Sequence, residues 1–255
     1  MHFTTETSSN GVIERSFTLG DVTGVLWSPA SLPGRAPLVL MGHGGGLHKR
    51  AQGLVARAHH LVTTCGYIVA AIDAPGHGDR PRSAADNQSV SALLEARAAG
   101  GPIGRIVADY NASLAERAVP EWQAALDALQ ELPEIGPDGP VGYTGMTLAS
   151  AIGLPLMAVE PRITAAVVGG VLVYDSLLEA AARITIPIQF LLPWDDEEID
   201  RASGLALFDT FASTEKTLHA NPGGHHQVPW FEAEDSVAFF ARHFDARTRA
   251  VALGR

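Results

Sequence analysis

The sequence predicts an α/β fold with a mostly parallel central sheet of about eight strands and helices on both faces. The chain has 255 residues, of which 46% are hydrophobic, which is enough to bury a full core. From residue 37 onward, short apolar runs alternate with helix-like segments, which is the order of βαβ units. Runs such as PLVLMG at residues 37–42 are apolar throughout, as in strands that are buried on both faces.

The individual elements follow from the same patterns. Residues 12–28 are expected to form an antiparallel hairpin at the sheet edge, with its turn at Gly20 and Asp21. Further strands are expected at residues 37–42, 67–73, 140–145, 162–173, 186–193 and 215–221. Helices are expected at residues 48–65, 121–132, about 148–159, 201–213 and 231–247. We interpret residues 1–255 as a single domain, in which a helical insertion at residues 80–120, broken by GGPIG, roofs the strand ends.

Composition narrows the classes of partner. Lys and Arg total 18 against 28 Asp and Glu, and no basic stripe occurs, so we expect no nucleic-acid partner. No stretch approaches the roughly 20 apolar residues of a membrane span, and the polar N-terminus does not look like a secretory signal. The single cysteine, Cys65, allows no internal disulfide, which fits a reducing compartment. We therefore expect a cytoplasmic protein, monomeric or homodimeric, that acts on a small molecule.

Five glycine-rich or charged loops follow the expected strands, where parallel sheets gather their function. They are GHGGG (42–46), DAPGHGDR (73–80), GMTLA (145–149), WDDEEI (194–199) and GGHH (223–226). In chain order they offer backbone donors, a hydroxyl, a carboxylate and a histidine. Acyl transfer needs these four components: a nucleophile, a base, a carboxylate that orients the base, and donors for the oxyanion.

The five loops and their order resemble the α/β-hydrolase fold, and most closely small bacterial esterases of the dienelactone-hydrolase-like and prolyl-oligopeptidase-like kind. The likeness covers nearly the whole chain, from PLVLMGHGGG through YIVAAIDAPGHGDR and AIGLPLMAVEPRI to NPGGHHQVPWF. It implies hydrolysis of a carboxylic ester or lactone of a small substrate, with no cofactor.

The resemblance places the nucleophile on Thr147. The family pattern G-x-S-x-G stands here as Gly145-Met146-Thr147-Leu148-Ala149, so a threonine replaces the serine and an alanine replaces the second glycine. Thr144 is the rival hydroxyl, and Ser150 is expected to be packed or exposed. A threonine keeps the hydroxyl, but its methyl group stiffens the side chain and crowds the attacked carbonyl. We therefore expect Thr147 to be a slow or selective nucleophile.

The same resemblance implies the acid and the base of a triad. Similar proteins carry D-x-x-V or D-x-x-I after the relevant strand, which selects Asp196 with Ile199, and Asp195 is the alternative. The family histidine follows a glycine directly, which selects His225. His226 is the alternative, or a wall of the pocket.

Backbone N–H groups are expected to stabilise the oxyanion, one from Leu148 and one from Gly45 or Gly46. The pocket is expected to be small and largely apolar. Weaker candidates for its wall are His43, Trp194, His226 and Trp230. The histidines show no regular metal-ligand spacing, and the sequence has no H-E-x-x-H motif and no cysteine pair. We therefore expect no metal.

Two other functions stay open at this point. One is a lyase, cyclase or epimerase on the same fold, in which His225 is the acid and base and Thr147 only donates a hydrogen bond. The other is a ligand-binding protein without catalysis. An acid, a histidine and a glycine loop in register with a hydroxyl favour the hydrolase.

Overall fold

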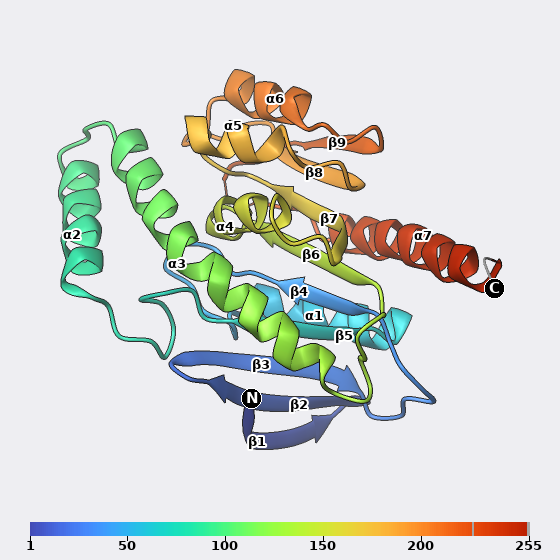
Figure 1. Ribbon diagram of the computed structural model, residues 1–255. Helices are drawn as coiled ribbons and strands as arrows, with labels where there is room; N and C mark the ends of the chain where they lie inside the picture. Colours follow the sequence, from blue (N-terminus) through green and yellow to red (C-terminus); the bar gives the residue numbers. More distant parts are fainter. Residues whose placement is uncertain (226, 254–255) are drawn as a thin grey trace.

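The computed structural model describes residues 1–225 and 227–253, and for residues 245–253 it describes the backbone alone. Its centre is a nine-stranded sheet in the order β1-β2-β3-β5-β4-β6-β7-β8-β9 (Figure 1). The strands are β1 His2–Ser9, β2 Val12–Leu19, β3 Val22–Pro29, β4 Leu38–Met41, β5 Ile68–Ile72, β6 Val141–Met146, β7 Ile163–Gly169, β8 Ile188–Pro193 and β9 Lys216–Asn221. The helices are α1 Gln52–Cys65, α2 Ala84–Ala98, α3 Gly104–Gln130, α4 Leu148–Met157, α5 Asp175–Ala181, α6 Arg201–Thr210 and α7 Phe231–Leu253.

The fold class predicted from the sequence is confirmed. The strands β1, β2, β3 and β5 pair antiparallel at one side of the sheet, and β5, β4, β6, β7, β8 and β9 pair parallel. Because parallel strands end at the same edge, the loops after them gather above that edge. The loops GMTLA, WDDEEI and GGHH, which carry the predicted nucleophile, acid and histidine, follow β6, β8 and β9, respectively.

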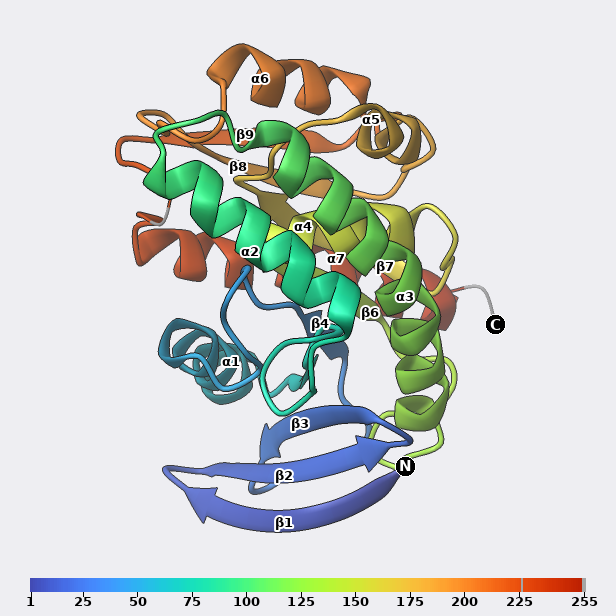
Figure 2. The same cartoon turned by 90° about the vertical axis from the view of Figure 1, so that its left-hand side faces the viewer.

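The sheet separates two hydrophobic cores, because successive side chains of a strand point to opposite faces. Leu38 and Leu40 of β4 join the core with residues of α3, α4, α5 and α6. Val39 and Met41 of the same strand join the core with residues of α1 and α7. The helix α2 lies outside both cores, in front of the molecule in Figure 2, and Asp86 is its one buried residue.

Three elements differ from the prediction. Strand β1 was not predicted, because its side chains are almost all exposed and polar and show no apolar alternation. The short helix α5 was not predicted either. The part of the helical insertion that follows GGPIG and the helix expected at residues 121–132 form one helix, α3, which continues through Pro120. Its buried face, which includes Leu114, Trp122 and Leu126, packs on the sheet on both sides of the proline and offsets the lost backbone hydrogen bond. Within the described residues, no helix is both long and apolar enough to cross a membrane.

Candidate active site

Thr147 occupies a sharp turn between β6 and α4. Its backbone has φ 58° and ψ −117°, and positive φ is unusual for a β-branched residue. Such a conformation costs on the order of 1–3 kcal/mol and persists only where the surroundings hold it. A threonine at the start of a helix commonly caps it, but the Thr147 side chain makes no capping hydrogen bond. The hydroxyl is therefore not used to begin α4.

The turn depends on the absence of side chains around Ala149. A Cβ atom on Gly145 would lie 2.3 Å from the Ala149 Cβ, and one on Gly42 would lie 2.6 Å from it. Carbon atoms in contact normally lie about 3.5–4.0 Å apart. Gly42 of the neighbouring glycine loop therefore provides the space that an alanine needs at the position where the family pattern has glycine.

Two buried hydroxyls fix the turn to the sheet. The Tyr143 hydroxyl donates to the Ala149 carbonyl at 2.6 Å, and its burial raises the pKa of Tyr143, which keeps it a donor. The Ser150 hydroxyl is directed at the carbonyls of Gly145 and Gly169 at 2.8 and 2.9 Å, and it accepts from the Gly169 N–H at 2.9 Å. Ser150 is thus packed, one of the two outcomes expected from the sequence, and joins β6 to β7.

The loop after β8 and the loop after β9 bring a carboxylate and an imidazole together. The His225 Nδ1 lies 2.8 Å from Asp196 Oδ2. The other carboxylate oxygen of Asp196 accepts from the N–H groups of Glu198 and Ile199 at 2.8 and 3.0 Å. The Asp196 side chain is 3% exposed, so it is an oriented, buried partner for the ring.

The alternatives considered from the sequence fall elsewhere. Asp195 turns away from His225, and its carboxylate accepts from the Gly223 N–H at 2.9 Å. Thr144 lies within β6, before the turn. His226, expected as an alternative base or a pocket wall, lies outside the described residues.

The glycine loop after β4 lies against the Thr147 hydroxyl. A Cβ atom on Gly44 would be 2.9 Å from Thr147 Oγ1, so a side chain there would displace the hydroxyl or the loop. Gly44 was not singled out from the sequence, although its place in the run GHGGG was the available signal. Gly46 has φ 73°, which favours glycine.

His43 anchors this glycine loop. Its Nδ1 donates to the Gly44 carbonyl at 2.9 Å, and its Nε2 accepts from the Ala74 N–H at 3.0 Å. Burial lowers the pKa of His43 to about 4, so the ring is neutral near pH 7 and can serve both roles. The ring thus joins the loop after β4 to the loop after β5.

A buried ion pair joins the same two loops. Asp73 is completely buried and accepts from the Lys49 Nζ at 2.5 Å and from the Lys49 N–H at 2.8 Å. Thr23 and the Asp79 N–H also donate to it. Burial alone would raise the pKa of Asp73, but these hydrogen bonds lower it on balance, so the carboxylate stays charged.

The backbone around Thr147 can accept a negative charge. Leu148 is the first residue of α4, so its N–H has no carbonyl within the helix to bond. A helix N-terminus also carries partial positive charge. Gly45 is close above it, since a Cβ atom on Gly45 would lie 3.9 Å from the Leu148 Cβ. The start of α4 therefore places a backbone N–H beside Thr147, and Gly45 lies close to it.

Two cavities meet at Thr147. The first, of about 430 Å³, lies under α2 and α3, and the second, of about 480 Å³, lies between α1, α7 and the edge of the sheet. Gly45, Thr147 and His225 line both of them. A molecule bound at the threonine therefore has space to extend in two directions.

The roof of the first cavity is fastened at both ends of α2. At its start, Asp86 accepts from the N–H and hydroxyl of Ser83 and from Arg117 at 2.6 Å. Burial opposes the charge on Asp86, but the bonds from Arg117 and Ser83 outweigh it and lower its pKa to about 2. At the other end, Arg97 pairs with Glu198 at 3.1 Å. That pair ties α2 to the loop that carries Asp196.

The two tryptophans expected at the pocket lie elsewhere, which corrects the sequence interpretation. Neither is among the described residues that line the two cavities. Trp194 is 39% exposed, and the Arg201 guanidinium lies 4.0 Å from its ring centre. Trp230 is 48% exposed and packs against His60. His43 does line the second cavity, as expected.

Comparisons with known proteins show the family of the chain. No protein-family profile and no curated protein matches the chain. Among solved structures, a cold-adapted esterase from an Arctic intertidal metagenomic library, in a complex with polyethylene glycol, is 32% identical, with a TM-score of 0.75 over 96% of this chain and 100% of that one.

Two more distant structures share the fold. The acetyl xylan esterase from Paenibacillus sp. R4 is 13% identical, with a TM-score of 0.70 over 95% of this chain and 87% of that one. Est1E from Butyrivibrio proteoclasticus, with ferulic acid bound, is 14% identical, with a TM-score of 0.64 over 94% and 99%. The identity and coverage of the Arctic enzyme, together with the observed fold, show that the chain belongs to the esterases of the α/β-hydrolase fold.

Proposed function

We propose that the protein hydrolyses a carboxylic ester or lactone of a small molecule through an acyl-enzyme intermediate on Thr147. His225 is the base and Asp196 orients it. The observation that carries the proposal is the position of the Thr147 hydroxyl. It is presented by a strained turn, and Thr147 shares the lining of both cavities with His225, whose Nδ1 bonds Asp196.

The reaction follows from this arrangement. Thr147 Oγ1 attacks the ester carbonyl and passes its proton to His225 Nε2, while Asp196 holds the opposite ring nitrogen. The oxyanion accepts hydrogen bonds from the N–H of Leu148 and of Gly45 or Gly46. Collapse releases the alcohol, which takes the proton from His225. A water molecule, deprotonated by His225, then attacks the acyl group; the acyl–Oγ1 bond breaks, His225 returns the proton to Thr147 Oγ1, and the carboxylic acid leaves.

The two cavities support a substrate with two arms of moderate size. Each has the volume of a small-molecule site. The walls are mostly apolar: Leu93, Ile106 and Leu114 in the first, and Met41, Leu54 and Val228 in the second. Such a site suits a short or medium acyl group esterified to an alcohol of similar size better than a polymer. Membership of the dienelactone-hydrolase-like or prolyl-oligopeptidase-like esterases stays a prediction from the loops.

The methyl group of Thr147 sets the expected selectivity. Gly44 leaves the space beside the hydroxyl open, so the methyl group of Thr147 is the added bulk next to the attacking oxygen. Displacement of a reacting atom by about 1 Å can cost on the order of a hundredfold in rate. We therefore expect small or activated acyl groups to react faster than bulky ones.

The test uses p-nitrophenyl esters of increasing chain length. We expect Thr147→Ala to lower kcat by on the order of a thousandfold or more, and Asp196→Asn to lower it by a comparable factor through the wrong ring tautomer. Asp195→Asn is the matched control, because it alters a carboxylate in the same loop that accepts from the Gly223 N–H. We expect it to keep most of the activity.

The same panel separates the other enzyme classes. Activity that survives Thr147→Ala but disappears in His225→Ala would reject the acyl-enzyme and favour a lyase or epimerase. Thr147→Ser measures the effect of the methyl group. A faster reaction with bulky acyl groups would show that the methyl is limiting.

A further inference from the structure

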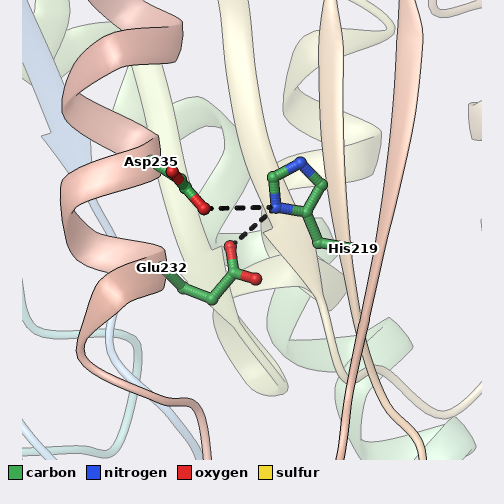
Figure 3. Close-up of side chains that lie close together, drawn as sticks. All are labelled: His219, Glu232 and Asp235. Atoms are coloured by element: carbon green, nitrogen blue, oxygen red, sulfur yellow. Dashed lines mark hydrogen bonds and ion pairs between the residues drawn. The ribbon is translucent and has the colours of Figure 1, made fainter.

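A second group of titratable side chains lies beside the active site. His219 is in β9, and Glu232 and Asp235 are near the start of α7, three residues apart and therefore on one face of the helix (Figure 3). The His219 Nδ1 lies 2.8 Å from Glu232 Oε2 and 4.0 Å from Asp235 Oδ2. All three donor atoms lie within 4.8 Å of one another. We propose that His219, Glu232 and Asp235 form a binding site for one divalent transition-metal cation, best fitted by Zn²⁺.

The donor set and its dimensions support zinc. One imidazole nitrogen and two carboxylate oxygens are ordinary zinc ligands, and a tetrahedral ion keeps its fourth position for water. With metal–ligand distances of about 2.0–2.2 Å, tetrahedral donors lie roughly 3.4 Å apart. The two distances from His219 Nδ1, 2.8 and 4.0 Å, fall on either side of that value, and the two carboxylate oxygens lie within 4.8 Å of each other, so side-chain movements of about 1 Å bring the donors into place.

The surroundings of Glu232 resemble the supporting shell of a metal ligand. Its side chain is 2% exposed. The Asn221 Nδ2 donates to Oε1 at 2.5 Å, and the Gln189 Nε2 donates to Oε2 at 3.3 Å. Such outer hydrogen bonds orient a carboxylate toward its metal. They are neutral donors, so two carboxylates face at most one positive charge on His219, and a divalent cation would balance the cluster.

The proposed metal site is accessible to solvent and lies at both ends of the segment that carries His225. The Asp235 side chain is 53% exposed, which leaves a path for a hydrated ion to enter. The site also joins β9, which ends at Asn221, to α7, which begins at Phe231, and the connection between these elements carries His225. Glu232 lines the second cavity together with Thr147. A bound cation would therefore fasten both ends of the segment that holds the base.

The test is a calorimetric titration of tag-free, chelator-treated protein with ZnCl₂. We expect one ion per chain, and an affinity at least a hundredfold lower in both His219→Ala and Asp235→Asn. Asp235→Asn is the decisive variant, because Asp235 is half-exposed and the Glu232 network stays in place. Glu234→Gln is the matched control, since Glu234 is an exposed carboxylate of the same helical turn, and its binding should equal that of the wild type.

His225→Ala guards against zinc bound by the catalytic base, and the stoichiometric site should persist in it. Zinc at a hundredfold excess over its Kd should raise the Tm by roughly 5–10 °C in the wild type and not in Asp235→Asn. The proposal is overturned if no stoichiometric site is found, if binding survives both ligand variants, or if Glu234→Gln weakens it equally. Binding is read without turnover, so this result is independent of the proposed esterase mechanism.

Discussion

The close packing of Gly42 against Ala149 allows a quantitative test of the turn at Thr147. In Gly42→Ala, the new methyl would lie 2.6 Å from the Ala149 Cβ and 2.7 Å from the Tyr143 hydroxyl oxygen. The first of these contacts is about 1 Å shorter than a normal carbon–carbon contact. Overpacking of this kind costs about 1–3 kcal/mol. For a chain of this length, that corresponds to a fall in Tm of roughly 2–12 °C.

The same substitution should also reduce kcat/KM strongly. Ala149 lies two residues after Thr147, so relief of the overlap shifts the turn and with it Oγ1. Displacement by about 1 Å costs on the order of a hundredfold in kcat/KM. The assays are thermal unfolding followed by circular dichroism, and hydrolysis of p-nitrophenyl acetate. Gly34→Ala is the control, because a Cβ atom there meets nothing within 4 Å.

The second-site variant makes this prediction specific. Ala149→Gly in the Gly42→Ala background removes the 2.6 Å contact and should raise kcat/KM at least tenfold above that of Gly42→Ala. A double-mutant cycle measures this coupling between positions 42 and 149. The 2.7 Å contact with the Tyr143 hydroxyl remains, so recovery should be partial. The reasoning would be refuted if Gly42→Ala had the Tm and the hydrolysis rate of the wild type. It would also be refuted if the double variant hydrolysed the ester no faster than Gly42→Ala.

Three further predictions concern the cavities and the buried charges. Val107→Phe narrows the first cavity and Val228→Phe narrows the second. When kcat/KM is measured for esters that vary in acyl and in alcohol length, each variant should reduce it about tenfold or more for esters extended on one side, a different side for each variant. Identical substrate profiles of the two variants would contradict the two-arm substrate. The pKa of His43 is about 4 in the folded chain against 6.5 in the unfolded chain, so the contribution of the neutral ring to stability is lost as pH falls through that range. The free energy of unfolding of His43→Gln, measured with urea, should therefore depend less on pH between these values than that of the wild type. The pKa of Asp86 is about 2 in the folded chain against 3.8 in the unfolded chain, so its contribution to stability is lost as pH falls through that range. Asp86→Asn should lower the free energy of unfolding at neutral pH by on the order of 2 kcal/mol and flatten its pH dependence between about pH 4 and pH 2; an unchanged slope would contradict the Arg117–Asp86 link.

Local patterns were sufficient for most of the architecture. The buried strands carry continuous apolar runs, and the turn at Gly20 has the positive φ that its glycine suggested. Strand β1 escaped because it pairs at an edge with both faces exposed, so no apolar alternation marks it. The continuity of α3 through Pro120 also escaped, because packing on the sheet overrode a local helix-breaking signal.

For the site, loop order was informative and side-chain direction was not. The sequence placed the hydroxyl, carboxylate and histidine in the loops after β6, β8 and β9, but Asp195 and Asp196 are adjacent, and the folded loop shows that Asp196 bonds His225. The exposure of Trp194 had no sequence signal. His219 and Glu232 lie 13 residues apart on different elements, so no ligand spacing revealed their approach.

The most direct measurement of the central claim is the mapping of a covalent adduct. The wild-type protein is incubated with an activated p-nitrophenyl phosphonate, which transfers its phosphonyl group to the nucleophile and releases p-nitrophenol, and the modified residue is found by mass spectrometry of peptides. We expect one adduct per chain, on Thr147, absent in Thr147→Ala and formed more slowly in Asp196→Asn. An adduct on another residue, or turnover of esters by Thr147→Ala at the wild-type rate, would contradict the account.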